Sequence, residues 1–396
     1  MLGGALIVVL ATCATLATAR VAPIDETLEL FNPELITKYR YPVEVHSVTT
    51  SDGYILEMHR IPYGRDNNNV PDQRKPVAFV MHGLLSSSAV WVVTGPSASL
   101  AYIHLAEAGY DVWLGNARGN TYSRRHITLD PDARRDTTFW EFSWDEIGNY
   151  DLPAMIDYAL EYTNKDQLHY IGHSQGTTTF FVLGSLRPDY NDKIITMHAL
   201  APVAYMAHNQ SPLVAALLGK GEFLQNNDII SWAGAAACRD EVIFQPICSN
   251  ILFLLGGWNE AQHNATVLPI VLGHLPAGSS VRQLAHYAQG ISEKEFRRYD
   301  YGNPLSNYRA YGSFTPPSYN LDRITAPVYL HYSLNDPLAE VEDVDRLYGE
   351  LGNPVDKFQV PLDTFTHIDF MWAIDVKELL YDTVISQMKE ADANGK

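Results

Sequence analysis

One serine in this sequence lies in a setting suited to covalent chemistry. The pentapeptide Gly172–Gly176 (GHSQG) follows the apolar run Leu168–Ile171 and precedes a helical pattern that begins at Thr177. In such a strand–turn–helix unit the turn is so tight that it needs glycines, and it pushes the serine oxygen out above a sheet. A G-x-S-x-G string alone arises easily in a chain with 26 glycines. The context therefore predicts that Ser174 is a nucleophile.

A serine nucleophile needs a histidine to take its proton and a carboxylate to orient that histidine. In the fold that this motif indicates, the acid and then the histidine follow late strands of the sheet. Asp336 follows the strand-like run Pro327–Tyr332, and His367 follows a strand that ends near Pro361. We therefore predict Asp336 as the acid and His367 as the base.

Other carboxylates and histidines are alternatives for these two roles. Asp363 and Asp369 lie closer to His367 in the sequence, but neither stands at the end of the preceding strand. Asp336 therefore stays the preferred acid. We expect the histidines of a strand pattern and of the later insertion to be structural or solvent-facing, namely His331, His263, His274 and His286.

The negative oxygen of a tetrahedral intermediate needs preorganised donors. In this fold the amide after the nucleophile supplies one donor and the loop after an early strand supplies the other. Gln175 follows the nucleophile, and Leu84 lies in the loop after the strand-like run Val77–Val80. We predict these two amides as the oxyanion hole. The nearby His82 side chain either hydrogen-bonds the loop backbone, which we favour, or contacts the substrate.

Short apolar runs alternate with longer amphipathic segments along the chain. This alternation predicts an α/β fold with a mostly parallel sheet, because parallel strands need helical crossovers. The expected strands are Tyr54–Ile61, Val77–Met81, Tyr110–Leu114, Leu168–Ile171, Ile194–Leu200, Pro327–Tyr332 and Lys357–Pro361. The expected helices are Leu152–Tyr162, Thr177–Leu186, Val344–Leu351 and a final one from Asp375 to Met388.

The alternation stops near residue 204 and returns near residue 323. The intervening segment has the pattern of helices and irregular loops rich in Leu, Ala, Asn and aromatic residues. We therefore expect residues 20–203 and 323–396 to form the core domain and residues 204–322 to form an inserted, mainly helical domain. Its apolar residues either cover a lipid-binding site in water or are ordinary core, the clearest being Phe223, Ile229, Ile230 and Trp232.

Charge and motif content exclude several classes of partner. The formal net charge is −18, and the acidic residues are scattered, so nucleic acid would be repelled. No histidine and carboxylate cluster has zinc spacing, and no glycine-rich phosphate loop follows the first strands. The sequence therefore implies no metal and no cofactor.

The first residues are typical of an export signal. Met1–Ala19 holds no charged side chain, and its apolar run is too short to cross a bilayer. We expect a signal peptide ending near Ala19 and no transmembrane anchor. Cys238 and Cys248 then remain in an oxidising compartment, where a disulfide is expected and two buried thiols are the alternative. Asn264 and Asn209 are candidate glycosylation sites, with Asn264 preferred.

With these residues in place, the chain resembles the acid lipase family of gastric and lysosomal lipases and their insect digestive relatives, over nearly all of its mature length. The segments that carry the resemblance are Tyr41–Glu44, Thr49–Tyr54, His82–Leu84, Gly115–Asn120, Phe142–Glu146 and Gly172–Gly176.

The resemblance implies an α/β-hydrolase fold and a catalytic function. It places nucleophile, acid and base on Ser174, Asp336 and His367, and the oxyanion amides on Leu84 and Gln175. It also implies that residues 204–322 form a cap with a mobile lid, and that Cys238 and Cys248 form the cap's disulfide.

The expected activity is hydrolysis of lipid esters at an oil–water or membrane interface. Triacylglycerol is the leading substrate and cholesteryl ester the next. A carboxylesterase acting on soluble esters, a serine peptidase of the same fold and a catalytically silent lipid-binding protein are the alternatives. Export indicates a secreted or lysosomal location. The oligomeric state stays open.

Overall fold

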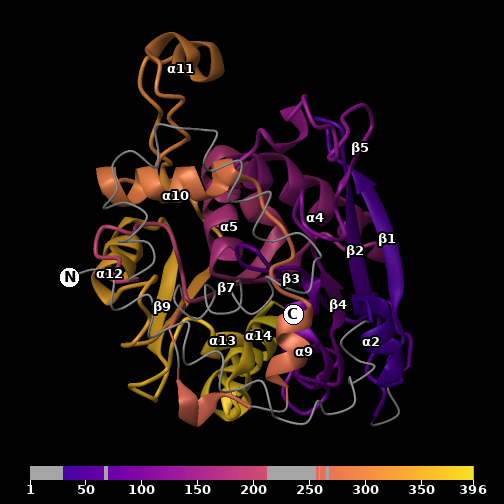
Figure 1. Cartoon of the computed structure of the whole chain (residues 1–396). Coiled ribbons are helices and arrows are strands. Elements are labelled where there is room, and N and C mark those ends of the chain that lie inside the picture. Colours follow the sequence, from indigo (N-terminus) through magenta and orange to yellow (C-terminus); the bar gives the residue numbers. More distant parts are fainter. Residues whose placement is uncertain (1–29, 67–69, 212–255, 258, 265–266, 396) are drawn as a thin grey trace, which may run out of the picture.

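The computed structural model describes residues 30–66, 70–211, 256–257, 259–264 and 267–395 (Figure 1). A nine-stranded sheet runs through the molecule in the order β1-β2-β4-β3-β6-β7-β8-β9, with β5 paired to β2. The strands from β4 to β9 along this path are parallel, whereas β1 and β2 are antiparallel. The strands are β1 Glu44–Thr49, β2 Tyr54–Ile61, β3 Val77–Met81, β4 Asp111–Leu114, β5 Arg125–His126, β6 Leu168–His173, β7 Ile194–Leu200, β8 Val328–Tyr332 and β9 Pro354–Gln359.

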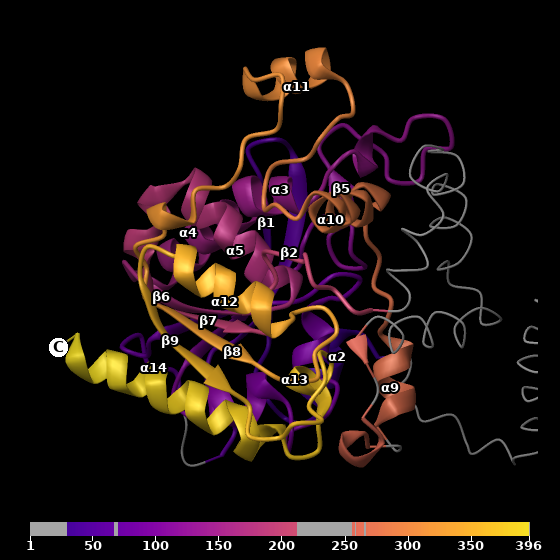
Figure 2. The same ribbon diagram turned by 90° about the vertical axis from the view of Figure 1, so that its left-hand side faces the viewer.

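Helices cover both faces of this sheet. Figure 2 shows α4, α5 and α12 on one side and α14 on the other. The α-helices are α2 Asn32–Lys38, α3 Trp144–Glu146, α4 Leu152–Thr163, α5 Gln175–Leu186, α9 Leu268–Gly273, α10 Val281–Glu293, α11 Pro304–Tyr311, α12 Val341–Glu350, α13 Asp369–Trp372 and α14 Asp382–Asn394. The π-helices are η3 Leu100–Ala106, η5 Ile147–Asp151 and η9 Lys377–Tyr381. The predicted α/β fold class is confirmed.

Several predicted boundaries were wrong, and each error has a physical cause. The strand β1 was missed because only one of its six residues is buried, so it shows no apolar run. The strand β9 begins at Pro354 rather than Lys357, since it is a partly exposed strand at the sheet edge. The helix α5 begins at Gln175 rather than Thr177. Its first turn was missed because glycine disfavours helices, so Gly176 did not indicate a helical residue. The last helical segment begins with η9 and extends to Asn394.

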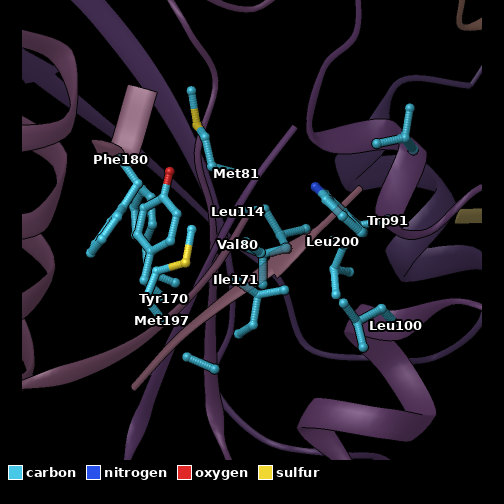
Figure 3. Packing of buried hydrophobic residues seen from close by; sticks show 14 of the residues in the cluster. Val80, Met81, Trp91, Leu100, Leu114, Tyr170, Ile171, Phe180, Met197 and Leu200 are labelled. Atoms are coloured by element: carbon cyan, nitrogen blue, oxygen red, sulfur yellow. The ribbon is translucent and has the colours of Figure 1, made fainter. Parts of the chain in front are cut away.

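The central strands form the core on which the later loops rest. Every residue of β3 and β6 is buried, as expected for parallel strands covered on both faces. Figure 3 shows side chains of these two strands packed with others from helices and adjoining strands, among them Val80, Met81, Trp91, Leu100, Leu114, Tyr170, Ile171, Phe180, Met197 and Leu200. The carboxyl ends of β3 and β6 are thus held side by side, with Met81 opposite Gly172.

A buried arginine joins three separate segments of the core. The Arg118 guanidinium donates to Asp52 at 2.6 and 2.9 Å and to Asp151 at 2.7 Å, and its backbone amide also donates to Asp151. The guanidinium lies 3.9 Å from the ring centre of Tyr54. Burial raises the pKa of Asp151 to about 6, although the charge and the hydrogen bonds of Arg118 act to lower it. These contacts tie the β1–β2 turn to the loop after β4 and to the start of α4.

The segment between β7 and β8 is anchored on the core through α10. His286 stacks on Trp144 with ring centres 3.6 Å apart, and it hydrogen-bonds Ser143 and the carbonyl of Arg297. Burial lowers the pKa of His286 to about 3. Arg298 pairs with Asp145 at 2.8 Å. The contacts of His286 therefore hold α10 against the core.

Several predicted features lie outside the described residues. They are the signal peptide Met1–Ala19, the apolar residues Phe223, Ile229, Ile230 and Trp232, and the cysteines Cys238 and Cys248. Over the ranges that are described, none of the helices has both the length and the apolar character needed to span a bilayer.

Candidate active site

Ser174 occupies a strained turn between β6 and α5. Its backbone has φ 53° and ψ −119°, a region that residues other than glycine rarely adopt. Its amide donates to the carbonyl of Leu200 at 3.0 Å, which ties the turn to the end of β7. Ser174 directly follows β6, so it lies at the carboxyl edge of the sheet, as in a nucleophile turn. The residue is half-buried.

The two glycines of the turn are required by close backbone approach. A Cβ atom on Gly172 would lie 2.6 Å from the carbonyl oxygen of Gly176, and one on Gly176 would lie 2.4 Å from the carbonyl oxygen of Met81. Both neighbours are backbone atoms that cannot move aside. The turn therefore packs directly against the end of β3.

The loop after β3 lies against Ser174. A Cβ atom on Gly83 would be 3.1 Å from the Cβ of Ser174, so the next amide, that of Leu84, is beside the turn. The Leu84 amide makes no hydrogen bond to another described residue. Gln175 is the first residue of α5, where amides have no intrahelical acceptor and the helix dipole favours negative charge. Both predicted oxyanion donors thus border Ser174.

Hydrogen bonds of the His82 side chain hold the Gly83–Leu84 loop in place. Its Nδ1–H donates to the Gly83 carbonyl at 2.8 Å, and its Nε2 accepts from the Ala117 amide and the Asn120 side chain, both at 3.1 Å. Burial lowers the pKa of His82 to about 4, although the Gly83 carbonyl acts in the opposite direction. A neutral imidazole is required, because Nε2 faces two donors. This geometry agrees with the favoured structural role.

The structure brings Asp336 and His367 together from loops 31 residues apart. His367 Nδ1 lies 2.8 Å from Asp336 Oδ2 and 3.0 Å from Oδ1, and the amides of Leu338 and Ala339 donate to Oδ1 at 2.9 Å. Burial acts to raise the pKa of Asp336, but the charge of His367 and these hydrogen bonds hold it below its usual value. An ionised Asp336 selects the Nδ1–H tautomer of His367.

The second nitrogen of His367 has no hydrogen-bond partner among the described residues. Its Nε2 is buried and makes no hydrogen bond within the described part of the chain. In the tautomer that Asp336 selects, this nitrogen carries a lone pair. It can therefore accept a proton.

His173 is a residue whose contribution the sequence reasoning missed. Its Nε2–H donates to the backbone carbonyl of His367 at 2.9 Å, and the two rings have centres 4.9 Å apart. Burial, and then the charge of His367, lower the pKa of His173 to about 3, so it stays neutral. It places His367 next to the turn that carries Ser174. The only sequence signal was its position directly before the nucleophile.

The competing carboxylates have other surroundings. Asp369 is buried and accepts from the Thr366 amide at 2.7 Å and from Asn259 at 3.0 Å, and it lies 3.2 Å from His263. Asp363 is exposed. Asp369 thus braces the loop that carries the histidine, whose own amide donates to Gly256. Among the acids considered, Asp336 is the one that contacts His367.

The chain is similar in sequence to proteins named lipases. A family model described as a partial alpha/beta-hydrolase lipase region matches residues 32–95, and one described as the alpha/beta hydrolase fold matches residues 76–230. Lipase 1 of Drosophila melanogaster is 45% identical over 361 residues, which are 90% of this chain and 79% of that protein. The human gastric triacylglycerol lipase is 39% identical over 367 residues, 90% of each chain. The human lysosomal acid lipase/cholesteryl ester hydrolase is 38% identical over 381 residues, 94% of each chain.

The chain belongs to the acid lipase family. As an acid lipase it is a carboxylic ester hydrolase. A thermophilic esterase from Thermogutta terrifontis superposes with a TM-score of 0.53 at 12% identity, covering 88% of this chain and 99% of that one. That likeness concerns the fold alone.

A second Ser–His–carboxylate array exists in this acid lipase. His59 Nδ1 lies 2.9 Å from Ser88 Oγ, and its Nε2 lies 2.9 Å from Glu57. Ser88 is fully buried and accepts a hydrogen bond from Asn32 at 2.8 Å. Its hydroxyl has no access to a substrate, and the array joins α2 to the core. The same residue types therefore serve structure at the fully buried Ser88, whereas Ser174 is half-buried.

The remaining predicted residues have other surroundings. His331 is buried in β8 and contacts His198 at 3.3 Å, and burial lowers the pKa of His274 to about 4. Asn264 is exposed, whereas the side-chain nitrogen of Asn209 is buried. Both glycosylation sites stay predictions. The described residues contain no cluster of His, Cys, Asp and Glu suited to a metal ion.

Replacing Gly176 should break the turn. We expect Gly176→Ala to lower the free energy of unfolding by about 1–3 kcal/mol and to reduce ester hydrolysis strongly, because its Cβ would collide with the Met81 carbonyl. Urea denaturation and turnover of a soluble ester measure both effects. The control is Gly349→Ala in α12, where the Cβ meets open space and stability should rise by up to about 1 kcal/mol. Equal behaviour of the two variants would contradict the packing described.

Acid should weaken the fold through His82. Its pKa is about 4 when folded against 6.5 ordinarily, so the unfolded chain binds this proton first as the pH falls. Stability is therefore lost between pH 6.5 and 4, by about 3 kcal/mol for this group. His82→Gln removes the titration, and we expect its urea midpoint to fall less than that of the wild type over this range. Parallel pH profiles would show that His82 is not held neutral.

Proposed function

We propose that this acid lipase hydrolyses carboxylic esters of lipids by acyl transfer to Ser174. The observation that carries the proposal is the imidazole of His367. Its Nδ1 is hydrogen-bonded to the buried Asp336, its Nε2 makes no hydrogen bond to a described residue, and His173 places it beside the turn that carries Ser174. A serine hydrolase needs such an acid–base pair, with the second imidazole nitrogen ready to take the proton of the nucleophile.

The first chemical step forms an acyl-enzyme. His367 Nε2 accepts the proton of the Ser174 hydroxyl while the serine oxygen attacks the ester carbonyl carbon. The ionised Asp336 stabilises the imidazolium that forms. The amides of Leu84 and Gln175 donate to the negative carbonyl oxygen, which gains more from them than the neutral ester does.

The remaining steps release both products. The imidazolium of His367 protonates the departing alcohol oxygen as the ester bond breaks. Water then attacks the acyl-enzyme, with His367 again accepting a proton, and the collapse of that intermediate returns the proton to Ser174 and releases a fatty acid. No group outside this chain and water is needed.

Triacylglycerol is the proposed main substrate and cholesteryl ester the second. The support comes from relatives whose names are gastric triacylglycerol lipase and lysosomal acid lipase/cholesteryl ester hydrolase. The relatives match over at least 90% of this chain. We further propose that residues 204–322 form a cap with a lid that lipid interfaces displace.

We also propose export of the chain. The apolar segment Met1–Ala19 fits a signal peptide, and gastric and lysosomal relatives fit a secreted or lysosomal location. An exported chain would carry the Cys238–Cys248 disulfide and a glycan on Asn264.

Activity should depend on Ser174. We expect Ser174→Ala to lower the hydrolysis of emulsified triolein by at least about 10⁴-fold, because no acyl-enzyme can form. The matched control is Ser88→Ala, which removes a hydroxyl from the buried array and should leave turnover within about twofold at a temperature where both fold. Fatty acid release by titration measures the rates. A cholesteryl ester, a short soluble ester and a peptide amide complete the substrate set.

The outcomes are distinct. Equal activity of Ser174→Ala and the wild type would contradict the assigned nucleophile. Cleavage confined to the soluble ester would make the chain a carboxylesterase, and cleavage of the peptide alone would make it a peptidase. Absence of all cleavage by the folded wild type would favour a silent lipid-binding protein.

A further inference from the structure

A glutamine of the inserted segment contacts the residue that follows the nucleophile. The Nε2 of Gln175 donates to Oε1 of Gln283 at 2.6 Å, across 108 positions of sequence. Both side chains are buried, with exposed fractions of 4% and 2%. We infer that Gln283 is a positioning residue, which holds the oxyanion hole from α10. This inference rests on the proposed function, because it assigns Gln283 a part in the same acyl transfer.

Gln283 is itself held in one orientation. Its Nε2 donates to the Ser279 hydroxyl at 2.8 Å, and its backbone amide donates to the Ser280 hydroxyl at 3.3 Å. Ser280 caps the start of α10, and its hydroxyl also hydrogen-bonds the Phe142 carbonyl in the core. The amide of Gln283 therefore presents its oxygen, not its nitrogen, to Gln175.

The helix that carries Gln283 is fixed against the core. Figure 1 shows α10 lying on the α5 side of the sheet. The Tyr287 hydroxyl lies 3.1 Å from that of Thr178 on α5, and His286 stacks on Trp144 one turn away from Gln283. This contact surface makes α10 a rigid support for the first turn of α5.

Within the described part of the chain, Gln283 makes the one hydrogen bond to the side chain of Gln175. The Oε1 of Gln175 is buried without a partner among the described residues, so the bond to Gln283 orients the amide group. The preceding residue, Ser174, is in a strained conformation, and such strain persists only where the surroundings restrain it. Anchoring Gln175 restrains the peptide whose N–H is aimed at the developing oxyanion.

Loss of this restraint should affect the transition state more than substrate binding. The oxyanion gains more from an aimed donor than the neutral ester carbonyl does. We therefore expect Gln283→Leu, which keeps the volume and removes the acceptor, to lower kcat on a soluble ester by about tenfold with KM within about twofold. Phosphonylation of Ser174 by a p-nitrophenyl phosphonate should slow by a similar factor.

The matched control lies on the same helix. Gln289 makes two hydrogen bonds to the backbone of Asp300, so Gln289→Leu also removes two bonds of a glutamine on α10. We expect it to shift the urea midpoint about as much as Gln283→Leu while kcat stays unchanged. Gln175→Met removes the partner side chain but keeps its backbone amide. In a double-mutant cycle, Gln175→Met with Gln283→Leu should be no slower than either single variant.

Each result decides the inference. Equal kcat values for Gln283→Leu, Gln289→Leu and the wild type would overturn it, as would a loss in KM alone or full additivity in the cycle. Ser174→Ala separates this failure from failure of the proposed function. If Ser174→Ala is inactive and Gln283→Leu is fully active, only the role of Gln283 is wrong, whereas an active Ser174→Ala removes the acyl-transfer mechanism itself.

Discussion

A contact between two backbones organises this molecule: Gly176 lies so close to the carbonyl of Met81 that no side chain fits between them. The contact brings the turn after β6 against the end of β3, and it holds Ser174 in its strained conformation with a positive φ. Because Gly83 touches Ser174 from the same strand end, the loop that carries the Leu84 amide is located by the same packing. The proposed nucleophile and both candidate oxyanion donors thus depend on one glycine contact, supported by the fully buried strands β3 and β6.

Neutral histidines connect this contact to the rest of the site. His82 fixes the loop after β3 and His173 fixes the backbone of His367, and burial lowers the pKa of each to about 4 and about 3. A neutral imidazole donates through one nitrogen and accepts through the other, which suits loops whose carbonyls and amides need partners. His82 uses both nitrogens in this way, whereas Nδ1 of His173 makes no hydrogen bond to a described residue. His367 differs from both because one of its nitrogens faces an ionised carboxylate, which leaves the lone pair on Nε2, and Nε2 makes no hydrogen bond to a described residue. This arrangement allows His367 to accept a proton.

Local patterns in the sequence predicted the parts of the structure that depend on local chemistry. The apolar runs of β3 and β6 were predictable because both faces of these strands are buried. Asp336 and His367 were selected because they follow late strands of the sheet, in the chain order that this fold uses, and their catalytic roles stay predictions. The edge strands β1 and β9 were poorly predicted, because their exposed residues have no distinct pattern. The contributions of His173 and Gln283 could not be predicted, since each acts through a partner more than 100 positions away. The array around Ser88 shows the converse problem, in which the residue types of a catalytic site serve only to join α2 to the core.

Whether Ser174 is the nucleophile is tested most directly by covalent trapping. The protein would be incubated with a p-nitrophenyl alkylphosphonate, which phosphonylates an activated serine, and the modified peptide would be identified by mass spectrometry after proteolysis. We predict one equivalent of label, carried by the Ser174 hydroxyl, with ester hydrolysis lost in proportion to labelling. Label on another serine such as Ser88, or hydrolysis that continues after Ser174 is fully modified, would contradict the account.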